Sequence, residues 1–198
     1  GETAITDPAQ NDGKTGSPDA LTAGVLFTVT INACDVRWNT ATNGSSDQNV
    51  IISADSTDQP YAPEYSDQTP NLGNGAVNVN ITLKKATATT FYIEDNQGGV
   101  DLSSQTVLNV SVGANSTADQ LKLQLLVPGE TALPGSASGK IGAVTNRAAG
   151  TPFTVTVNLV DANWNYYNDN LAVGCSVQIT TDDPYDTHPS STALVYGT

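Results

Sequence analysis

Apolar and polar residues alternate along short segments of this chain. In the sequence LFTVTINA, which begins at Leu26, large apolar side chains occupy every second position, at Phe27, Val29 and Ile31. The positions between them are polar. A period of two is typical of a strand with one face against a core and the other in water. The same pattern returns later in the chain with Phe153, Val155 and Val157.

Further short segments share this composition and are bounded by Gly, Pro, Asn or Asp, which favour turns. We expect strands in the segments 50–53, 76–84, 90–94, 106–112, 122–127, 176–181 and 193–196. Helical spacing is hard to find. Because a parallel sheet would need helical crossovers, the pattern predicts an all-β chain built of antiparallel sandwiches.

The chain also contains an internal repeat. Residues 13–39 return in nearly the same form as residues 139–165, each copy opening with Gly-Lys-x-Gly and closing with Asp-x-x-Trp-Asn. The leading Gly-Glu-Thr returns at 129–131. Such self-similarity predicts modules in tandem. We therefore expect one domain at 1–118 and a second at 119–198, with the second incomplete within this chain and opened by the strand at 122–127.

A family resemblance rests on the order of four sequence blocks. They are LQLLVPGETALPG (123–135), GKIG (139–142), AGTPFTVTVNLVDANWN (149–165) and VQITTDD (177–183). This order resembles the repeat of bacterial immunoglobulin-like domains of the Big and invasin type. The resemblance implies two tandem immunoglobulin-like antiparallel β-sandwiches, an extracellular or cell-surface location, a structural or adhesive role, and frequently cations at the junctions.

Two departures from the full pattern concern missing strands. The first module has no counterpart of 122–127 before Gly1, and the second has no counterpart of 76–112. A sandwich without these strands has an open edge and an uncovered apolar face. We expect either continuation into further repeats or strand addition from a neighbouring copy. Head-to-tail association that does not close on itself would build a filament.

Charge narrows the range of partners. The 198 residues include seven basic and twenty acidic side chains, for a formal charge of −13. This charge would repel a nucleic acid backbone or an anionic lipid surface. No apolar run approaches the length of a membrane span. An acidic chain suits salty or calcium-containing surroundings, and an opening at Gly1 without a signal peptide or Met indicates a processed or excerpted secreted protein.

The two cysteines, Cys34 and Cys175, lie at different positions in the two copies, one in each. A bridge within one module is therefore excluded. Strand parity places Cys34 on the outward face with Thr28 and Thr30, and Cys175 on the inward face with Val177. Two interpretations stay open: a disulfide between modules or between chains, or two unpaired thiols.

Acidic residues gather where strands are expected to end. Asp35 and Asp161 precede the tryptophans, while Asp55, Asp182 and Asp183 follow the next strand. Carboxylates at the tip of a sandwich could pool with backbone carbonyls to hold calcium. The alternative is that each Asp makes a turn by accepting hydrogen bonds from its own backbone. No EF-hand spacing supports the calcium hypothesis.

Aromatic side chains follow the same loops. Trp38, Trp164, Tyr166 and Tyr167 are candidates for contact with a glycan or a surface receptor. The alternative is that each Trp anchors a loop or core. A second tyrosine patch, at Tyr61 and Tyr65, suits an interface.

Catalytic motifs are missing from the sequence. It contains no GxSxG, phosphate-binding loop, CxxC or HExxH, and its only histidine, His188, has no nucleophile at a meaningful spacing. The sequence therefore predicts a non-enzymatic extracellular structural protein, a module of a bacterial surface stalk or polymerised filament. The alternative is an adhesin or carbohydrate-binding module that acts through the Trp and Tyr loops.

Overall fold

The computed structural model describes residues 1–6, 13–42, 49–60, 71–96, 103, 105–168 and 175–194. These residues form an all-β structure, whose helical content is limited to the short 3₁₀ turns η2 (Gly73–Gly75) and η3 (Ala118–Gln120). Neither turn, nor any other helix in the described ranges, is long and apolar enough to cross a membrane. The chain divides into unit 1, Gly1–Gly113, and unit 2, Ala114–Thr198, where the sequence predicted a boundary after residue 118.

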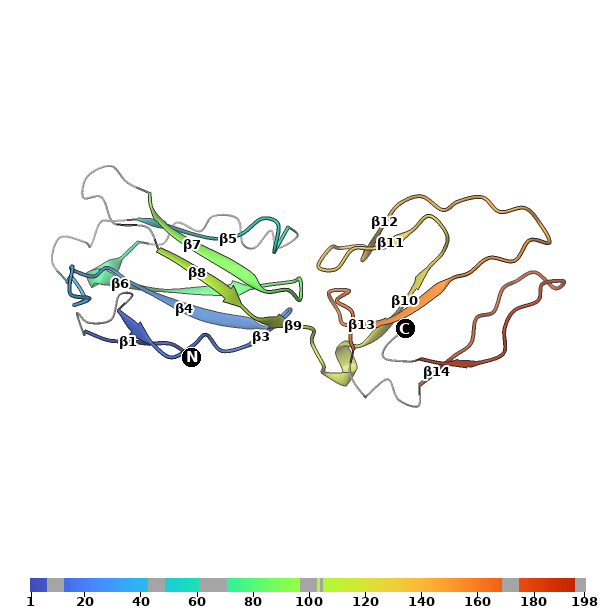
Figure 1. The fold of residues 1–198 in the computed structure, drawn as a ribbon, viewed down its shortest axis with the longest axis horizontal. Coiled ribbons are helices and arrows are strands. Elements are labelled where there is room, and N and C mark those ends of the chain that lie inside the picture. Colours follow the sequence, from blue (N-terminus) through green and yellow to red (C-terminus); the bar gives the residue numbers. More distant parts are fainter. Residues whose placement is uncertain are drawn as a thin grey trace. The chain divides into compact units, whose positions relative to one another are not determined.

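Unit 1 contains two main antiparallel sheets that face each other (Figure 1). One sheet pairs β4 (Leu26–Asn32) with β6 (Ala76–Thr82). The other has the order β5 (Val50–Ala54), β7 (Thr89–Asp95) and β8 (Gln105–Val110). Because the outer strands of each sheet have no further partner among the described residues, neither sheet closes into a barrel there.

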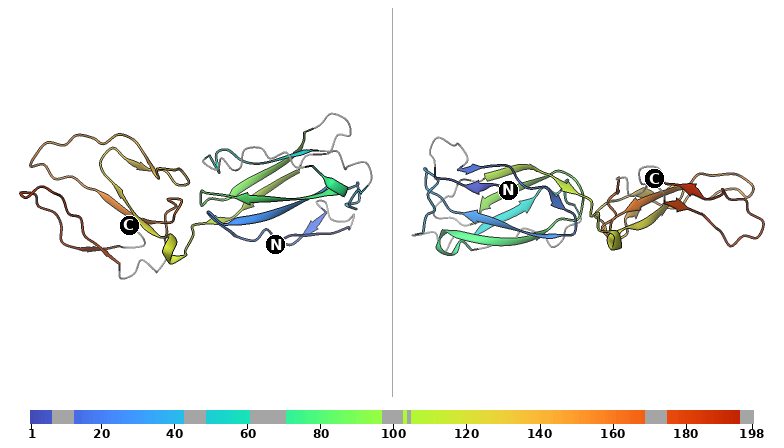
Figure 2. Two further views of the ribbon diagram at one scale, coloured as in Figure 1. Left: turned by 180° about the vertical axis from the view of Figure 1, so that it is seen from behind. Right: turned by 90° about the horizontal axis from the view of Figure 1, so that it is seen from below.

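Two smaller pairings complete unit 1. Strands β1 (Thr3–Ala4) and β2 (Lys14–Thr15) are antiparallel. Strands β3 (Leu21–Thr22) and β9 (Val112–Gly113) are parallel. The layers of unit 1 can be followed from behind and from below in Figure 2.

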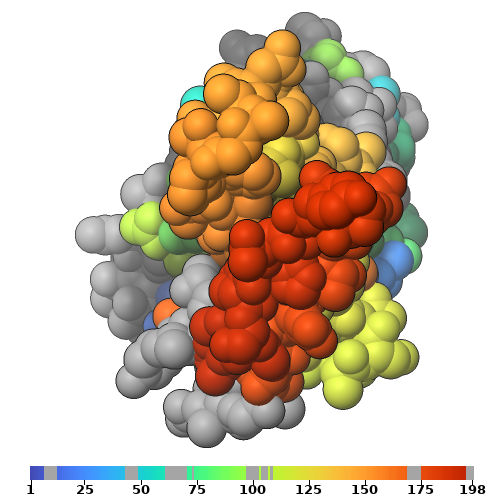
Figure 3. All heavy atoms as spheres, turned by 90° about the vertical axis from the view of Figure 1, so that its right-hand side faces the viewer, coloured from blue at the N-terminus to red at the C-terminus, as the bar shows by residue number. Residues whose placement is uncertain are grey.

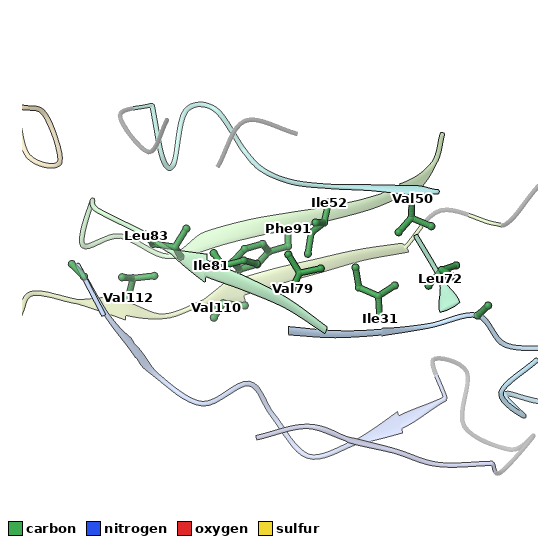
Figure 4. Packing of buried hydrophobic residues seen from close by; sticks show 12 residues of the cluster. Ile31, Val50, Ile52, Leu72, Val79, Ile81, Leu83, Phe91, Val110 and Val112 are labelled. Atoms are coloured by element: carbon green, nitrogen blue, oxygen red, sulfur yellow. The ribbon is translucent and has the colours of Figure 1, made fainter. Parts of the chain in front are cut away.

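The core of unit 1 lies between its two main sheets (Figure 4). Ile31, Val79 and Ile81 project from β4 and β6 toward Ile52 and Phe91 on the opposite sheet, and all five are at most 5% exposed. Phe27 packs edge-to-face against Phe91, with ring centroids 6.2 Å apart. The inward face predicted for β4 is therefore confirmed.

The outward face of β4 carries a ladder of polar pairs. Thr28 and Thr30 donate hydroxyl hydrogen bonds of 2.8 Å to the side-chain oxygens of Asn80 and Asn78 on β6. Cross-strand pairs of this kind stabilise a sheet on its solvent face. They also fix the register, since a slip by one residue would turn the apolar positions outward.

Unit 2 has fewer and shorter strands. They are β10 (Lys122–Leu126), β11 (Thr131–Ala132), β12 (Lys140–Ile141), β13 (Thr156–Val160), β14 (Ser176–Val177) and β15 (Thr192–Ala193). Among the described residues of unit 2, three antiparallel pairs form: β10–β13, β11–β12 and β14–β15. The buried cluster is small and centres on Leu159, Tyr167 and Leu194. The segments 141–154 (orange) and 178–193 (red) lie on the surface in Figure 3.

Two strand predictions in unit 2 are wrong in extent. The expected strand at 153–157 begins only at Thr156, and Phe153 is 55% exposed. The counterpart Phe27 packs on Phe91 of β7, whereas Phe153 has no aromatic partner among the described residues of unit 2. The strand expected at 176–181 ends at Val177. Of the strand expected at 193–196, residues 195 and 196 lie outside the described ranges.

Candidate functional site

The repeated Asp-x-x-Trp-Asn motif of unit 1 forms a tight loop directly after β4. One carboxylate oxygen of Asp35, Oδ1, accepts the backbone N–H of Arg37 at 2.8 Å and that of Asn39 at 3.0 Å. The Asn39 amide donates to Oδ2 at 2.9 Å. These hydrogen bonds, that from the Asn39 side chain first, lower the pKa of Asp35. The carboxylate therefore serves the turn that the sequence offered as an alternative to calcium.

Unit 2 builds the same loop after β13. Asp161 Oδ1 accepts the N–H groups of Asn163 at 2.8 Å and Asn165 at 2.9 Å, and the Asn165 amide reaches Oδ2 at 2.9 Å. One further donor distinguishes this copy, the backbone N–H of Asn115 at 2.9 Å from Oδ2. Asp161 is fully buried, whereas Asp35 is exposed.

Each motif tryptophan is held against a glycine. Trp38 and Trp164 have left-handed backbones, with φ of 63° and 65°. Their indoles lie over Gly13 and Gly139, where an added Cβ would come within 2.2 Å of the ring. Only glycine permits so close an approach. The recurrence of Gly and Trp in the sequence therefore reflects one packing contact made twice.

Trp164 has two further contacts. Its Nε1–H donates to the Ala137 carbonyl at 3.3 Å, and Lys122 Nζ lies 3.3 Å from the ring centroid, a cation–π arrangement. The geometry thus favours the loop-anchor interpretation of the tryptophans over stacking on a ligand.

The tyrosine candidates divide. Tyr166 is 39% exposed, whereas Tyr167 is 5% exposed and belongs to the unit 2 core. The prediction that Tyr167 contacts a ligand is therefore wrong, because the turn after Trp164 directs this side chain inward. Tyr61 and Tyr65 lie outside the described residues.

Two of the remaining acidic candidates, Asp55 and Asp183, also accept hydrogen bonds from the protein. Asp55 Oδ1 accepts the Thr57 N–H at 2.8 Å and Oδ2 accepts the Tyr92 hydroxyl at 3.1 Å. Hydrogen bonds from Thr57, then Tyr92, lower the pKa of Asp55, and the bond to Asp55 raises the pKa of Tyr92. Asp182 and Asp183 are exposed, and Asp183 Oδ1 accepts the Tyr185 N–H at 2.9 Å.

No three His, Cys, Asp or Glu side chains gather into a metal-binding group in the ranges that the structure describes. The structure thus does not bring the acidic candidates together. Calcium binding stays a prediction.

Cys34 and Cys175 form no disulfide with each other in this structure. Cys34 is half-buried, and burial, followed by the charge of Asp35, raises the pKa of its thiol. A raised pKa keeps the thiol protonated and slow to react. Cys175 is exposed, so its predicted inward orientation is wrong; it directly precedes the two-residue strand β14. A bridge between chains stays a prediction.

Sequence reasoning did not locate a hollow beside β4 in unit 1. A cavity of about 780 Å³ runs along β4, between that strand and the segment that carries β1 and β2. Core side chains line it, including Phe91, Ile93 and Val107, and Cys34 lies at one end. We call this hollow the β4 groove. The sequence signal for it was the missing counterpart of 122–127 in the first module.

No family model matches this chain, and no curated protein or solved structure shows significant similarity to it.

Proposed function

We propose that this chain is a non-enzymatic structural protein of the extracellular space or cell surface, made of tandem immunoglobulin-like sandwich units from a stalk or filament. The strand order of unit 1 supports the fold. Its pairs β4–β6 and β5–β7–β8 correspond to the B–E and C–F–G pairings of an immunoglobulin sandwich. In the same scheme β10–β13 of unit 2 is the A–B pair.

The observation that carries the proposal is the duplicated loop. Asp, Trp and Asn are the residues of the repeat with most capacity for chemistry, and in both units they bond to their own backbone or pack on glycine. A repeated site for a ligand would leave the polar groups of these side chains without hydrogen bonds inside the loop. Their use as internal braces supports a repeated scaffold.

A scaffold of this type would act mechanically. Antiparallel strands resist extension because many ladder hydrogen bonds must shear together. The charge of −13 would keep neighbouring fibres apart in solution.

Electron microscopy of the purified chain and of the native material tests the proposal. Rods or fibres with a regular repeat are expected. Monodisperse single particles in both samples would contradict it. Retention on a glycan column, lost in a Trp38→Phe, Trp164→Phe double variant and kept in Tyr185→Phe, would favour the adhesin alternative. An unchanged melting temperature in excess EDTA would remove the calcium prediction.

A further inference from the structure

The β4 groove contains one unpaired strand edge. Ala33, directly after β4, donates its N–H to Gly75 at 2.8 Å on the β6 side and accepts the Ala41 N–H at 2.8 Å. Backbone groups alternate in direction along an antiparallel strand, so those of Thr28, Thr30 and Asn32 point away from β6. In the part of unit 1 that the structure describes, no strand pairs with them. An exposed edge of this kind is a template for another strand.

Unit 2 shows what occupies the equivalent edge. The carbonyl of Leu159, the counterpart of Ala33, accepts the Tyr167 N–H at 2.9 Å, just as Ala33 accepts that of Ala41. The opposite edge of β13 is therefore the one that pairs with β10. Register places Leu126, Gln124 and Lys122 beside the counterparts of Thr30, Asn32 and Cys34, which are Thr156, Asn158 and Val160.

The central side chain of β10 is recognised by groups that unit 1 also has. Gln124 is 2% exposed, donates to the Gly139 carbonyl at 2.8 Å and accepts from the Asn158 amide at 3.0 Å. The counterparts Gly13 and Asn32 both line the β4 groove. The Asn32 side chain is exposed and makes no hydrogen bond within the described residues.

An ion pair holds the end of β10. Lys140 lies 2.8 Å from Glu130, whose second oxygen accepts the Val127 N–H at 3.0 Å, while Lys140 also reaches the Leu125 carbonyl at 3.4 Å. The counterpart pair in unit 1, Lys14 and Glu2, is already formed at 2.7 Å and lines the β4 groove. The ion pair that would hold the end of an added strand is thus already formed beside the unpaired edge.

The leucines of β10 fit the apolar part of the groove. Leu123 and Leu125 are 54% and 45% exposed in unit 2 and lie on the same side of the sheet as their partners Leu159 and Val157. The counterparts of those partners in unit 1 are Ala33 and Ile31, on the face that packs against the β5–β7–β8 sheet. A strand in the same register on β4 would therefore direct both leucines into the core.

We propose that the β4 groove is a receptor for one extended strand of the β10 pattern, Leu-Lys-Leu-Gln-Leu-Leu, antiparallel to β4 and supplied by an adjoining copy of the repeat. Recognition is by main-chain pairing, with Asn32 and Gly13 selecting the glutamine and the sandwich core accepting two leucines. A small apolar ligand would leave the strand edge unpaired. That the groove receives a strand follows from unit 1 itself; only the identification of an adjoining copy as the supplier of that strand rests on the proposed function.

Thiol labelling of Cys34 tests this in the full chain. With Cys175→Ser removing the other thiol, a peptide with the sequence of residues 120–128 is expected to slow modification of Cys34 about tenfold or more, because the strand covers it. A peptide with aspartate at both positions equivalent to Leu123 and Leu125 is expected to have no effect. Equal rates with no peptide and with the native peptide, or equal protection by both peptides, would overturn the proposal.

A matched pair of variants locates the binding. Thr30→Pro removes an N–H that points into the groove, whereas Asn78→Pro removes one on the outer edge of β6, and both lose the same Thr30–Asn78 hydrogen bond. Protection by the native peptide is expected to disappear only in Thr30→Pro. Equal protection in both variants would contradict the proposed edge. If Thr30→Pro does not fold, the peptide pair above decides alone.

Joining the 120–128 sequence directly ahead of Gly1 raises the local strand concentration to the millimolar range. This fusion is expected to protect Cys34 and the amides of Thr28, Thr30 and Asn32 without added peptide. An unchanged Cys34 rate in the fusion would overturn the proposal. Failure of the filament hypothesis would appear separately, as single particles in micrographs of a chain that still binds the peptide.

Discussion

Unit 1 buries the apolar face of β4 between two sheets and leaves one edge of that strand unpaired. Unit 2 has the opposite arrangement: β10 covers the edge of β13, while Leu123 and Leu125 on the apolar face stay about half exposed. The two strands have nearly the same sequence. What differs is which neighbouring strands are present, so the neighbours decide whether the edge of a repeated strand is paired and how well the apolar face of its sheet is covered.

The paired aspartates show the same effect on a smaller scale. Asp35 and Asp161 make the same hydrogen bonds within their loops, but only Asp161 also accepts the Asn115 N–H and is buried. The motif sets the local turn in both units. In unit 2 its burial coincides with the additional contact from Asn115.

Truncating an apolar side chain to alanine is expected to give the largest difference in stability loss between the two units. Ile81→Ala, at 1% exposure in unit 1, should lower the free energy of unfolding by about 2–5 kcal/mol. Leu123→Ala in unit 2, at 54% exposure, should change it by about 0.5 kcal/mol or less. Urea unfolding followed by Trp38 fluorescence for unit 1 and by Trp164 for unit 2 measures both. Equal losses would contradict the difference in core closure.

Removing the two aspartates should also give unequal effects. Asp161→Ala leaves the N–H groups of Asn115, Asn163 and Asn165 without their acceptor in a buried site, and is expected to destabilise unit 2 by about 3 kcal/mol. Asp35→Ala should affect unit 1 less, because water can reach the same groups. Urea midpoints of the two variants make the comparison, and a larger loss for Asp35→Ala would refute it.

Replacing either glycine beneath a tryptophan by alanine should lower the stability of its unit by a similar amount. Gly13→Ala and Gly139→Ala each place a Cβ within 2.2 Å of an indole at a positive φ, and each should cost about 2 kcal/mol or more. Gly150→Ala provides a control, since it has a positive φ of 74° but no heavy atom within 4 Å of the added Cβ. Thermal melting is the readout. A loss for Gly13→Ala no larger than for Gly150→Ala would show that the Trp–Gly contact is not close.

The smallest expected effect is a pH dependence in unit 2. Hydrogen bonds from Lys140 and then from the Val127 N–H lower the pKa of Glu130 below its ordinary value of 4.5. A depressed carboxyl pKa contributes stability that is complete above pH 4.5 and is lost as the pH falls through the lower, folded-state value. Urea midpoints of unit 2 between pH 3 and 6 should therefore fall less steeply in Glu130→Gln. Identical profiles would remove the ion pair from the account.

Much of the fold follows from local sequence. Period-two alternation located β4, β5, β6, β7 and β10 to within one or two residues at most of their ends, because each of these strands has a partner that buries its apolar side. The repeat identified Asp35 with Asp161 and Trp38 with Trp164 before their geometry was known. The choice between turn and metal ligand was left open, since both use the same residues.

Prediction from the sequence failed for side chains whose burial depends on strands far along the chain. Alternation predicted Phe153 as a strand residue, but without a counterpart of Phe91 it is exposed. Tyr167 follows a polar loop and gave no local sign of its burial. The β4 groove is likewise a property of pairing between distant segments, and only the unequal copies of the repeat pointed to it.

Native-state hydrogen exchange along β4, read residue by residue by NMR, shows most directly whether the edge of β4 that faces the groove is unpaired. Alternating exchange rates are expected in the chain without added peptide. The amides of Phe27, Val29 and Ile31, bonded to β6, should exchange slowly, and those of Thr28, Thr30 and Asn32 should exchange fast. Uniformly slow exchange of all six amides would mean that the edge facing the groove is already paired, and would contradict the account.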